Sequence, residues 1–334
     1  MIEITDNPDK TKWADFVHNH PHGNIFQTPE IAEVYKRTKN YEPITLAAID
    51  TKSNEIIALV NAVIIKEFSG FLGKLTARSI IQGGPLFIDN QNSKDAVKVL
   101  MEHYNSAAKN KAIYTQIRNM WDQNNTNNLF ESAGYDFIEH LNFLIDLNRP
   151  VDVIWSDIHK SRRKGINRAE SAGIIIDIVK DKKDVKEIYN IIQATYKKVG
   201  FPIADISLLE SAFEVLVLGN KAQFYWAKHD DKCVGARISL NFKGLLYDWY
   251  AGSLPDIPYV DEALVWFILK DGAAKGYKSF DFGGAGSPHE EYGVREFKRR
   301  FGGDLVNYGR YMNVHNKILF YLAKKVIELK KHRA

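Results

Sequence analysis

Residues 246–309 hold the glycines and carboxylates whose types and spacing could support chemistry. Asp248 lies in the segment LYDWYAGS, and Asp281 directly precedes the glycine-rich segment FGGAG. A strand that ends in such a bend and then opens a helix can expose backbone N–H groups to an anion or an oxyanion. Glycines also serve ordinary tight turns, so the bend alone leaves both interpretations open. The patterns GxxxxGK(S/T) and GxGxxG are absent, which argues against a P-loop and against a dinucleotide fold.

The sequence offers little support for thiol or metal chemistry. Cys233 is the only cysteine, so neither an internal disulfide nor a thiolate metal cluster can form. It lies in a predicted strand, KCVGARISL, where a thiol of the core or the sheet edge is the expected state. His289, Glu290 and Glu291 are adjacent, adjacent residues rarely chelate one metal, and the HExxH spacing is absent. We therefore expect no metal and no cofactor.

A predicted helix at residues 153–172 concentrates basic side chains. Lys160, Lys164 and Arg168 recur at a spacing of four, which places them along one face, and Arg163 is adjacent to this face. Such a stripe suits the phosphates of a nucleotide-linked precursor or the backbone of a tRNA. The same pattern is typical of a solvated surface helix, so both interpretations stay open.

These residues require a framework of alternating strands and helices, which predicts the α/β (α+β) class. The 334 residues suit two domains, and the best boundary is Arg149-Pro150, which divides the chain into 1–150 and 151–334. Both halves place helices, an antiparallel hairpin and a helix–strand–helix unit in the same order. The expected helices are 9–18, one opening at Thr28-Pro29-Glu30, 93–110, 153–172, 183–198, 206–218, 260–275, one beginning near Tyr292, and 314–331; the expected strands are 44–50, 55–66, 112–118, 137–147, 174–179, 221–228, 233–241, 245–251 and 279–282.

The composition is that of an ordinary globular protein, with 45% hydrophobic and 26% charged residues. A net charge of +4 permits an anionic ligand such as a nucleotide, a phosphate or tRNA without requiring one. No apolar run reaches the roughly 20 residues of a membrane span, and the polar N-terminus is unlike a secretory signal, so we expect a cytoplasmic protein. The lysine-rich helix 314–331 either packs on its own domain or lies on an anionic membrane surface.

Several segments together resemble the Fem-type (FemABX) transferases. FDFGG, followed by a helix bearing GVREFKRRFGG, is similar to the C-terminal signature of this family, and YAGS followed by Pro258-Tyr259 is similar to the part before it. SRRKGINRAESAGIIIDI resembles the family's basic helix and next strand, and NIFQTPEIAEVYKRTKNYEPI resembles its N-terminal region. The resemblance implies two tandem GNAT-like (acyl-CoA N-acyltransferase-like) domains with mixed sheets flanked by helices. It also implies transfer of an amino acid from aminoacyl-tRNA to an amine of a peptidoglycan-like precursor.

The resemblance assigns roles to single residues. Phe297 and Lys298 match a Phe-Lys pair near the 3′ end of the tRNA, where the lysine would stabilise the anionic intermediate and the ring would stack on the terminal adenine. A core ring and a solvated lysine are the ordinary alternatives. Lys36 matches a lysine at the precursor phosphate. Independently of the resemblance, Asp281 and Asp248 are carboxylates at strand positions, and either could accept a proton from the attacking ammonium. Asp281 could equally hold the glycine bend through backbone hydrogen bonds. Three side chains in predicted strands are further candidates for binding the acceptor, namely Arg237, Tyr247 and Tyr250. Arg237 could instead pair with Asp248 or Asp281, and the two tyrosines could pack in the core.

We therefore expect an aminoacyltransferase whose donor is aminoacyl-tRNA and whose acceptor is a nucleotide- or lipid-linked envelope precursor. Two alternatives stay open. A GNAT-like enzyme that uses acyl-CoA would carry the pattern Q/R-x-x-G-x-G/A between a strand and a helix, whereas Ser253–Tyr259 has prolines at this place. A binding module for tRNA or precursor would keep the basic stripe and show no transfer with any donor.

Overall fold

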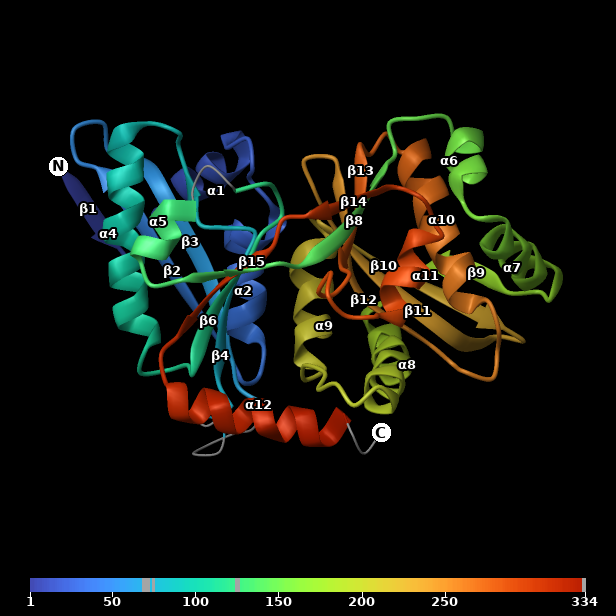
Figure 1. The fold of residues 1–334 in the computed structure, drawn as a ribbon. Helices are drawn as coiled ribbons and strands as arrows, with labels where there is room; N and C mark the ends of the chain where they lie inside the picture. The colour runs from blue at the N-terminus through green and yellow to red at the C-terminus, as the bar shows by residue number, and fades with distance from the viewer. Residues whose placement is uncertain (68–72, 74–75, 124–126, 332–334) are drawn as a thin grey trace. The chain divides into compact units, whose positions relative to one another are not determined.

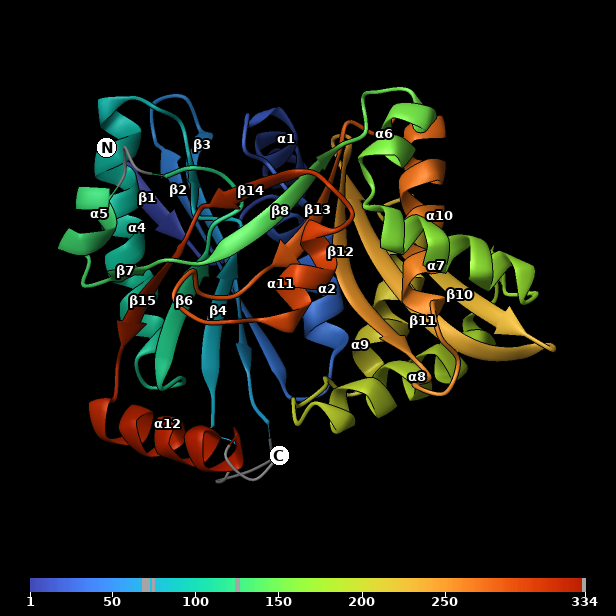
Figure 2. The same ribbon diagram turned by 45° about the vertical axis from the view of Figure 1, so that its right-hand side comes forward.

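The computed structural model describes residues 1–67, 73, 76–123 and 127–331, with the backbone alone for residues 127 and 326–331. The chain forms two units, Met1–Glu139 with Tyr308–Ala334, and His140–Asn307. Each unit is built on its own mixed sheet with flanking helices (Figures 1 and 2). The expected α/β class is therefore confirmed.

The sheet of the first unit has the strand order β1-β2-β3-β4-β6-β15-β7, and β5 pairs with β3. All of these described pairs are antiparallel except β4 with β6, which is parallel. Val97, Leu100, Met101 and Tyr104 form the buried face of helix α4 and belong to the core of this unit. The elements are β1 Ile2–Thr5, α1 Lys10–Asn19, η1 Ile25–Gln27, α2 Pro29–Arg37, β2 Tyr41–Asp50, β3 Glu55–Ile65, β4 Arg78–Gln82, β5 Leu86–Phe87, α4 Gln91–Ala108, β6 Tyr114–Arg118, α5 Asn127–Ser132, β7 Asp136–Ile138, β15 Arg310–Val314 and α12 Lys317–Lys331.

Side-chain caps explain where the first two helices begin. Asp9 accepts hydrogen bonds of 3.0 and 2.9 Å from two backbone N–H groups in the first turn of α1. Thr28 caps α2 in the same way, and Pro29 occupies the first helical position, where its missing N–H costs no hydrogen bond. The expected helix start at Thr28-Pro29-Glu30 is confirmed.

The sheet of the second unit has the strand order β14-β8-β13-β12-β11-β10-β9. Helix α8 contacts β11 and β12, while α10 contacts β10, β11 and α7. The elements are β8 Leu141–Asp146, α6 Val151–Asp157, α7 Lys160–Ser171, β9 Ile175–Ile178, η3 Lys182–Asp184, α8 Val185–Lys198, α9 Ser207–Ala212, η4 Phe213–Val217, β10 Ala222–His229, β11 Lys232–Phe242, β12 Leu245–Ser253, α10 Val260–Ala274, β13 Ser279–Gly284, α11 Gly293–Arg299 and β14 Asp304–Asn307.

Strands β12 and β13 run parallel and then separate. Their pairing covers Leu245–Tyr247 and Ser279–Asp281, and both strands continue beyond it without pairing to each other. The backbone groups released by this separation lie at the carboxyl ends of two neighbouring parallel strands, where α/β sheets commonly place their sites. Asp248 and Asp281 lie at this point of the sequence.

Three expected elements and the expected domain division differ from the structure. The strand expected at 137–147 is two strands, because β7 pairs in the first sheet and β8 in the second. The helix expected at 153–172 is broken into α6 and α7. The helix expected at 314–331 begins at Lys317, after strand β15. The units therefore change at Glu139 rather than at Arg149-Pro150, and the chain returns to the first sheet after Asn307.

Candidate functional site

The ammonium of Lys298 is held against the glycine bend that ends β13. Helix α11 carries Lys298, whose Nζ donates to the backbone carbonyl oxygens of Phe282, Gly283 (3.2 Å) and Gly284 (3.0 Å). Gly283 has φ of +68°, a conformation that favours glycine and allows this sharp bend. The sequence left open whether the bend offers N–H groups to an anion or is an ordinary tight turn. In the structure three of its carbonyl oxygens accept from the Lys298 ammonium.

Asp281 is a buried carboxylate in which one oxygen accepts hydrogen bonds and the other accepts none from the described residues. Its side chain is 1% exposed. Oδ1 accepts hydrogen bonds of 2.7 Å from Asn142 Nδ2 and from the Gly283 backbone N–H. Oδ2 has no hydrogen-bond partner among the described residues. Because burial disfavours the charged form, the pKa of Asp281 is raised to about 6. A carboxyl group with this pKa, one of whose oxygens has no hydrogen bond, can take a proton near neutral pH.

Arg237 and Asp248 form a buried ion pair beside Asp281. Arg237 Nη1 lies 2.6 Å from Asp248 Oδ2, and Nη2 lies 3.5 Å from Asp261 Oδ1. Burial raises the pKa of Asp248 even though Arg237 and Lys298 act in the opposite direction. Asp248 Oδ1 has no hydrogen-bond partner in the described part of the chain. A buried carboxylate oxygen without a partner is costly and marks a place that a ligand group can complete.

We call Arg237, Asp248, Asp281 and Lys298 the charged cluster. Burial lowers the pKa of Lys298 to about 8, while the charges of Asp248 and Asp281 favour its ammonium form. The lysine therefore remains mainly protonated at pH 7. Its hydrogens are already donated to carbonyls, so it acts on a nearby negative charge chiefly through its own charge. The cluster thus combines an open proton acceptor with a buried cation, which suits attack by an amine on a carbonyl carbon.

Phe297 packs against an arginine that sequence analysis left without a role. The guanidinium of Arg162 lies 4.4 Å from the centre of the Phe297 ring, and the ring centre of Phe301, which follows α11, lies 5.2 Å from that of Phe297. Arg162 also forms a short ion pair with the buried carboxylate of Glu262. The missed signal is the spacing of Arg162, Ile166 and Ala169, which puts the arginine on the buried face of α7.

The expected basic stripe lies on α7. Lys160, Lys164 and Arg168 are all exposed there, and Arg163 beside them is half-buried. Arg168 Nη1 donates a 3.0 Å hydrogen bond to the Tyr259 hydroxyl, so one member of the stripe is already tied to the start of α10. The stripe is present as a surface, and its use for phosphates remains a prediction.

The remaining expected acceptor residues are distributed differently. Tyr247 and Tyr250 of β12 are half-buried, and the Tyr250 ring lies 5.8 Å from that of Tyr196 in α8. Arg237 is buried and contacts the carboxylates of Asp248 and Asp261, so it forms one of the two ion pairs considered for it, and its contact with the acceptor remains a prediction. Lys36 is exposed in the last turn of α2 and belongs to the first unit, so the charged cluster within the second unit forms without it.

The first turn of α10 is acidic. Asp261 accepts a 2.7 Å hydrogen bond from the Ser253 hydroxyl and faces Arg237, while Glu262 pairs with Arg162. Both carboxylates therefore have partners inside the unit. They occupy the positive end of a helix, where an added phosphate would meet negative charge.

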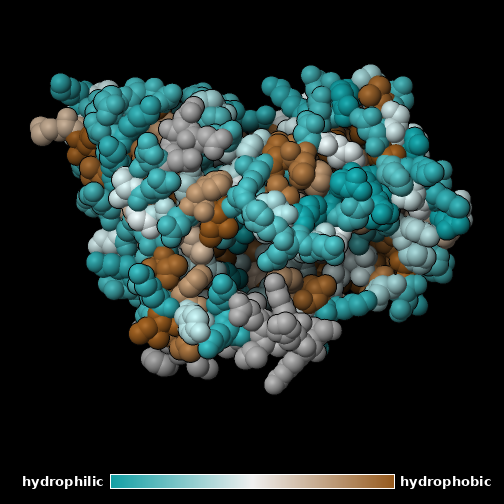
Figure 3. Space-filling model, viewed as in Figure 1, coloured by the Kyte–Doolittle hydropathy of each residue, from teal (hydrophilic) through white to brown (hydrophobic). Residues whose placement is uncertain are grey.

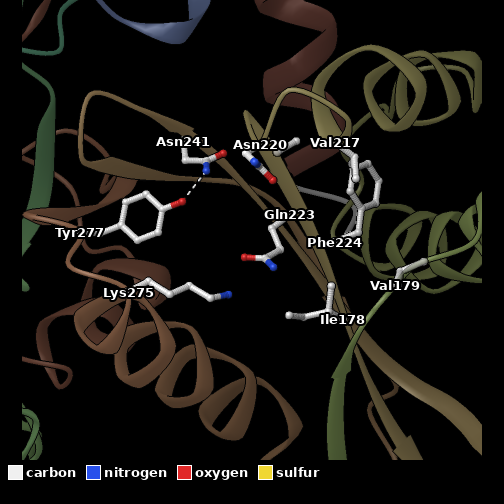
Figure 4. A pocket seen from close by; sticks show the side chains of 10 residues that line it. Ile178, Val179, Val217, Asn220, Gln223, Phe224, Asn241, Lys275 and Tyr277 are labelled. Carbon is white, nitrogen blue, oxygen red and sulfur yellow. Dashed lines mark hydrogen bonds between the residues drawn. The ribbon is translucent and has the colours of Figure 1, made fainter.

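A separate polar hollow of about 330 Å³ shares no lining residue with the charged cluster (Figure 4). The side chains of Gln223 and Lys275 point into it, and Asn241 Nδ2 donates a 2.5 Å hydrogen bond to the Tyr277 hydroxyl at its wall. In the described part of the chain, no three His, Cys, Asp or Glu residues gather as metal ligands. None of the described helices combines the length and apolar character needed to cross a membrane.

Comparison with known proteins supports an acyl-transfer fold. Residues 156–299 match a family described as "Acetyltransferase (GNAT) domain". The fold is similar to the crystal structure of FemX, with a TM-score of 0.70 and 15% identity over 96% of this chain and 99% of that one. The fold is also similar to that of L-PGS from Bacillus licheniformis, with a TM-score of 0.58 and 15% identity over 94% of each chain. A tandem GNAT protein from the clavulanic acid biosynthesis pathway has a similar fold, with a TM-score of 0.58 and 9% identity over 94% of this chain and 99% of that one.

No curated protein sequence matches the chain. At these identities the solved structures establish the fold alone. The expected tandem of GNAT-like domains is therefore confirmed, and the resemblance to the Fem-type transferases is confirmed at the level of the fold.

Proposed function

We propose that this acyltransferase moves an amino acid from aminoacyl-tRNA to an amine of a peptidoglycan-like cell-envelope precursor. The match of residues 156–299 to an acetyltransferase (GNAT) domain and the fold similarity to FemX support this proposal. The observation that carries this proposal is the charged cluster. It places the open Asp281 Oδ2 and the Lys298 ammonium near one another, at the point where β12 and β13 separate. Such a donor places the reaction in the cytoplasm, where charged tRNA is available.

The cluster supports a simple reaction course. An aminoacyl ester is already activated, so the enzyme has to orient the amine and stabilise the tetrahedral oxyanion. Asp281 accepts one proton from the acceptor ammonium, and the free amine forms the new C–N bond. Lys298 stabilises the negative charge on the former carbonyl oxygen. The C–O ester bond then breaks, the 3′ hydroxyl of the tRNA leaves with a proton, and the amide remains on the acceptor.

The acidic start of α10 supports a donor other than CoA. In GNAT enzymes that use CoA, a glycine-containing loop between a strand and a helix holds the pyrophosphate. Here the corresponding loop, Ser253–Tyr259, contains prolines, and the helix after it begins with Asp261 and Glu262. Two carboxylates at a helix N-terminus repel a diphosphate rather than bind it.

The donor and acceptor contacts follow from the remaining residues. We assign the exposed stripe Lys160, Lys164 and Arg168, with Arg163, to phosphates of the tRNA backbone. Phe297 lies at the same end of the unit and would meet the terminal adenosine of the tRNA. The acceptor, a nucleotide- or lipid-linked precursor, is assigned to Tyr247, Tyr250 and Arg237 in the second unit. The role at the precursor phosphate that the resemblance gives to Lys36 stays a separate prediction for the first unit.

The first experiment measures donor binding and transfer together. Purified protein is incubated with a pool of radiolabelled aminoacyl-tRNAs, and retention on a filter is compared with deacylated tRNA and with CoA as competitor. Transfer of label to a nucleotide-linked peptidoglycan precursor is then measured. Replacing Lys298 by Met should lower transfer by about 100-fold or more, because a charge at the oxyanion is lost.

Arg299→Met is the matched control, since Arg299 is the exposed neighbour of Lys298 and pairs with Glu296 away from the cluster. It should transfer like the unchanged protein. Full activity of Lys298→Met would remove the role assigned to this lysine. Binding of acyl-CoA without retention of any aminoacyl-tRNA would favour the second candidate, an N-acyltransferase using CoA, which the match of residues 156–299 to an acetyltransferase (GNAT) domain also fits. Retention of tRNA with no transfer would indicate a binding module.

A further inference from the structure

Helix α12 is attached to the first unit along one side. The Asn316 side chain caps it by accepting a 3.0 Å hydrogen bond from the Leu319 backbone N–H, and the Asn316 backbone N–H donates to the Ile113 carbonyl at 3.0 Å. The Phe320 ring packs edge-on against Tyr114 of β6, with 5.5 Å between the ring centres. The orientation of the first two turns of α12 is therefore set by contacts on the Phe320 side.

The opposite side of the same turns exposes apolar side chains to solvent. Ile318 is 75% exposed, Tyr321 57% and Leu322 52%. Their spacing of three and four residues places them together on one helix face. The Lys325 ammonium lies over this face, 4.7 Å from the centre of the Tyr321 ring. Figure 3 shows apolar surface where α12 lies. Such an exposed apolar group marks a binding surface, since it adds nothing to the core.

The helix also carries the chain's excess of positive charge. Residues 317–331 contain five lysines and one glutamate, which gives a net charge of +4. The whole chain has a net charge of +4, so all other residues together sum to zero. Lys317, Lys324 and Lys325 are exposed beside the apolar residues.

We propose that α12 docks the protein onto an anionic lipid surface, with Ile318, Tyr321 and Leu322 entering the headgroup region and the lysines contacting acidic headgroups. Apolar side chains with flanking lysines on one helix are the pattern of helices that lie in a membrane interface. A second copy of α12 would bring like charges together, and tRNA would leave the apolar side chains in water. The proposal concerns the first unit and does not depend on the transfer reaction.

The test is flotation of the full chain with vesicles of phosphatidylcholine and with vesicles in which part of it is replaced by phosphatidylglycerol. The expected result is at least roughly tenfold stronger binding to the anionic vesicles, which weakens as salt is added. Ile318→Ser/Leu322→Ser and Lys324→Gln/Lys325→Gln should each lower binding roughly tenfold or more. The first variant removes apolar surface that the membrane would bury, and the second removes two positive charges.

Matched controls come from the second unit. Lys197→Gln/Lys198→Gln removes two exposed lysines of α8, and Leu218→Ser removes an apolar side chain that is 88% exposed. Neither should change vesicle binding. Equal losses in the controls, or no binding to anionic vesicles, would overturn the proposal. So would binding of deacylated tRNA that is lost in Lys324→Gln/Lys325→Gln while vesicles are not bound.

A fluorescent label reports insertion directly. Leu322→Cys can be labelled selectively, because Cys233 is buried and burial raises the pKa of its thiol to about 11. A polarity-sensitive dye at residue 322 should shift to shorter wavelength with anionic vesicles, whereas the same dye on Leu218→Cys should not. Equal spectra at both positions would contradict insertion of α12. Thermal unfolding of each variant shows whether a loss of binding reflects a loss of folding.

Discussion

Asn142 Nδ2 donates a 2.7 Å hydrogen bond to Asp281 Oδ1 and so joins strands β8 and β13 at the charged cluster. The Gly283 backbone N–H donates to the same oxygen at 2.7 Å, which leaves Oδ2 free of hydrogen bonds within the described residues. The carboxylate is therefore fixed by one oxygen, while the other is buried and has no hydrogen bond. This arrangement turns a strand residue into a candidate proton acceptor and leads to the predictions below.

Asp281→Asn should raise the free energy of unfolding, relative to the unchanged protein, more at pH 7 than at pH 4. The pKa of Asp281 is about 6 in the folded protein against 3.8 for an ordinary aspartate, so folding favours the protonated carboxyl. Its contribution to stability is therefore fully present below pH 3.8 and is lost as the pH rises through 6. Asparagine stays neutral and keeps the Oδ1 acceptor. The gain should be about 1–3 kcal/mol at pH 7 relative to pH 4.

Urea unfolding of both proteins at pH 7 and at pH 4 measures this difference. Comparing the two pH values cancels the pH-independent cost of placing an amide NH₂ where Oδ2 stands. Asp95→Asn on the exposed side of α4 is the control, and it should show no such pH-dependent gain. The free energies of unfolding of the unchanged protein and of Asp281→Asn could instead differ by the same amount at both pH values. This result would mean that the carboxyl is ionised or neutral throughout.

The transfer rate should depend on pH with a maximum between about 6 and 8. Asp281 has to be ionised to accept a proton, so the rate falls below its pKa of about 6. Lys298 has to be protonated to stabilise the oxyanion, so the rate falls above its pKa of about 8. Lys298→Arg should move the alkaline decline to higher pH, because a guanidinium stays charged. An unchanged alkaline decline in this variant would assign that limb to another group.

Arg162→Leu should lower the free energy of unfolding by about 2–4 kcal/mol, because it leaves the buried Glu262 carboxylate without its partner. It also removes the guanidinium that covers Phe297. Arg162→Leu/Glu262→Gln should recover much of the loss, since no unpaired charge remains. Arg163→Leu on the same helix is the control and should change stability little. Chemical denaturation measures these proteins and Glu262→Gln alone, and an additive double variant would show that the two residues are not coupled.

Replacing the basic stripe should weaken tRNA binding in a salt-dependent way. In Lys160→Gln/Lys164→Gln/Arg168→Gln, the slope of log affinity against log salt should become shallower by about 2, since about three phosphate contacts are lost. The control, Lys186→Gln/Lys197→Gln/Lys198→Gln, removes three exposed lysines of α8. Filter binding over a range of salt concentrations measures both slopes. Equal changes in the two proteins would leave the stripe as an ordinary solvated surface.

Much of the framework could be predicted because its signals are local. The capping residues Asp9 and Thr28, the hairpin between β2 and β3, and Gly276 after α10 depend on neighbours within a few residues. The residues of the candidate site were also visible as types, since the glycine bend and Lys298 lie within one continuous segment. Their mutual orientation was not, because Asn142 and Asp248 reach Asp281 from other strands.

The sequence by itself determined the starts of α1 and α2, the hairpin of β2 and β3, the glycine bend and the identity of its charged neighbours, since these depend on local propensity and periodicity. Only the tertiary structure decided where the units divide. Strand β8 pairs with β13 and β14 of the second unit, whereas β15 pairs with β6 of the first unit. It also decided that the helix predicted at 153–172 breaks before His159, whose backbone N–H donates to the Arg300 carbonyl. Such pairings join segments far apart in the chain, and local pattern carries no information about them.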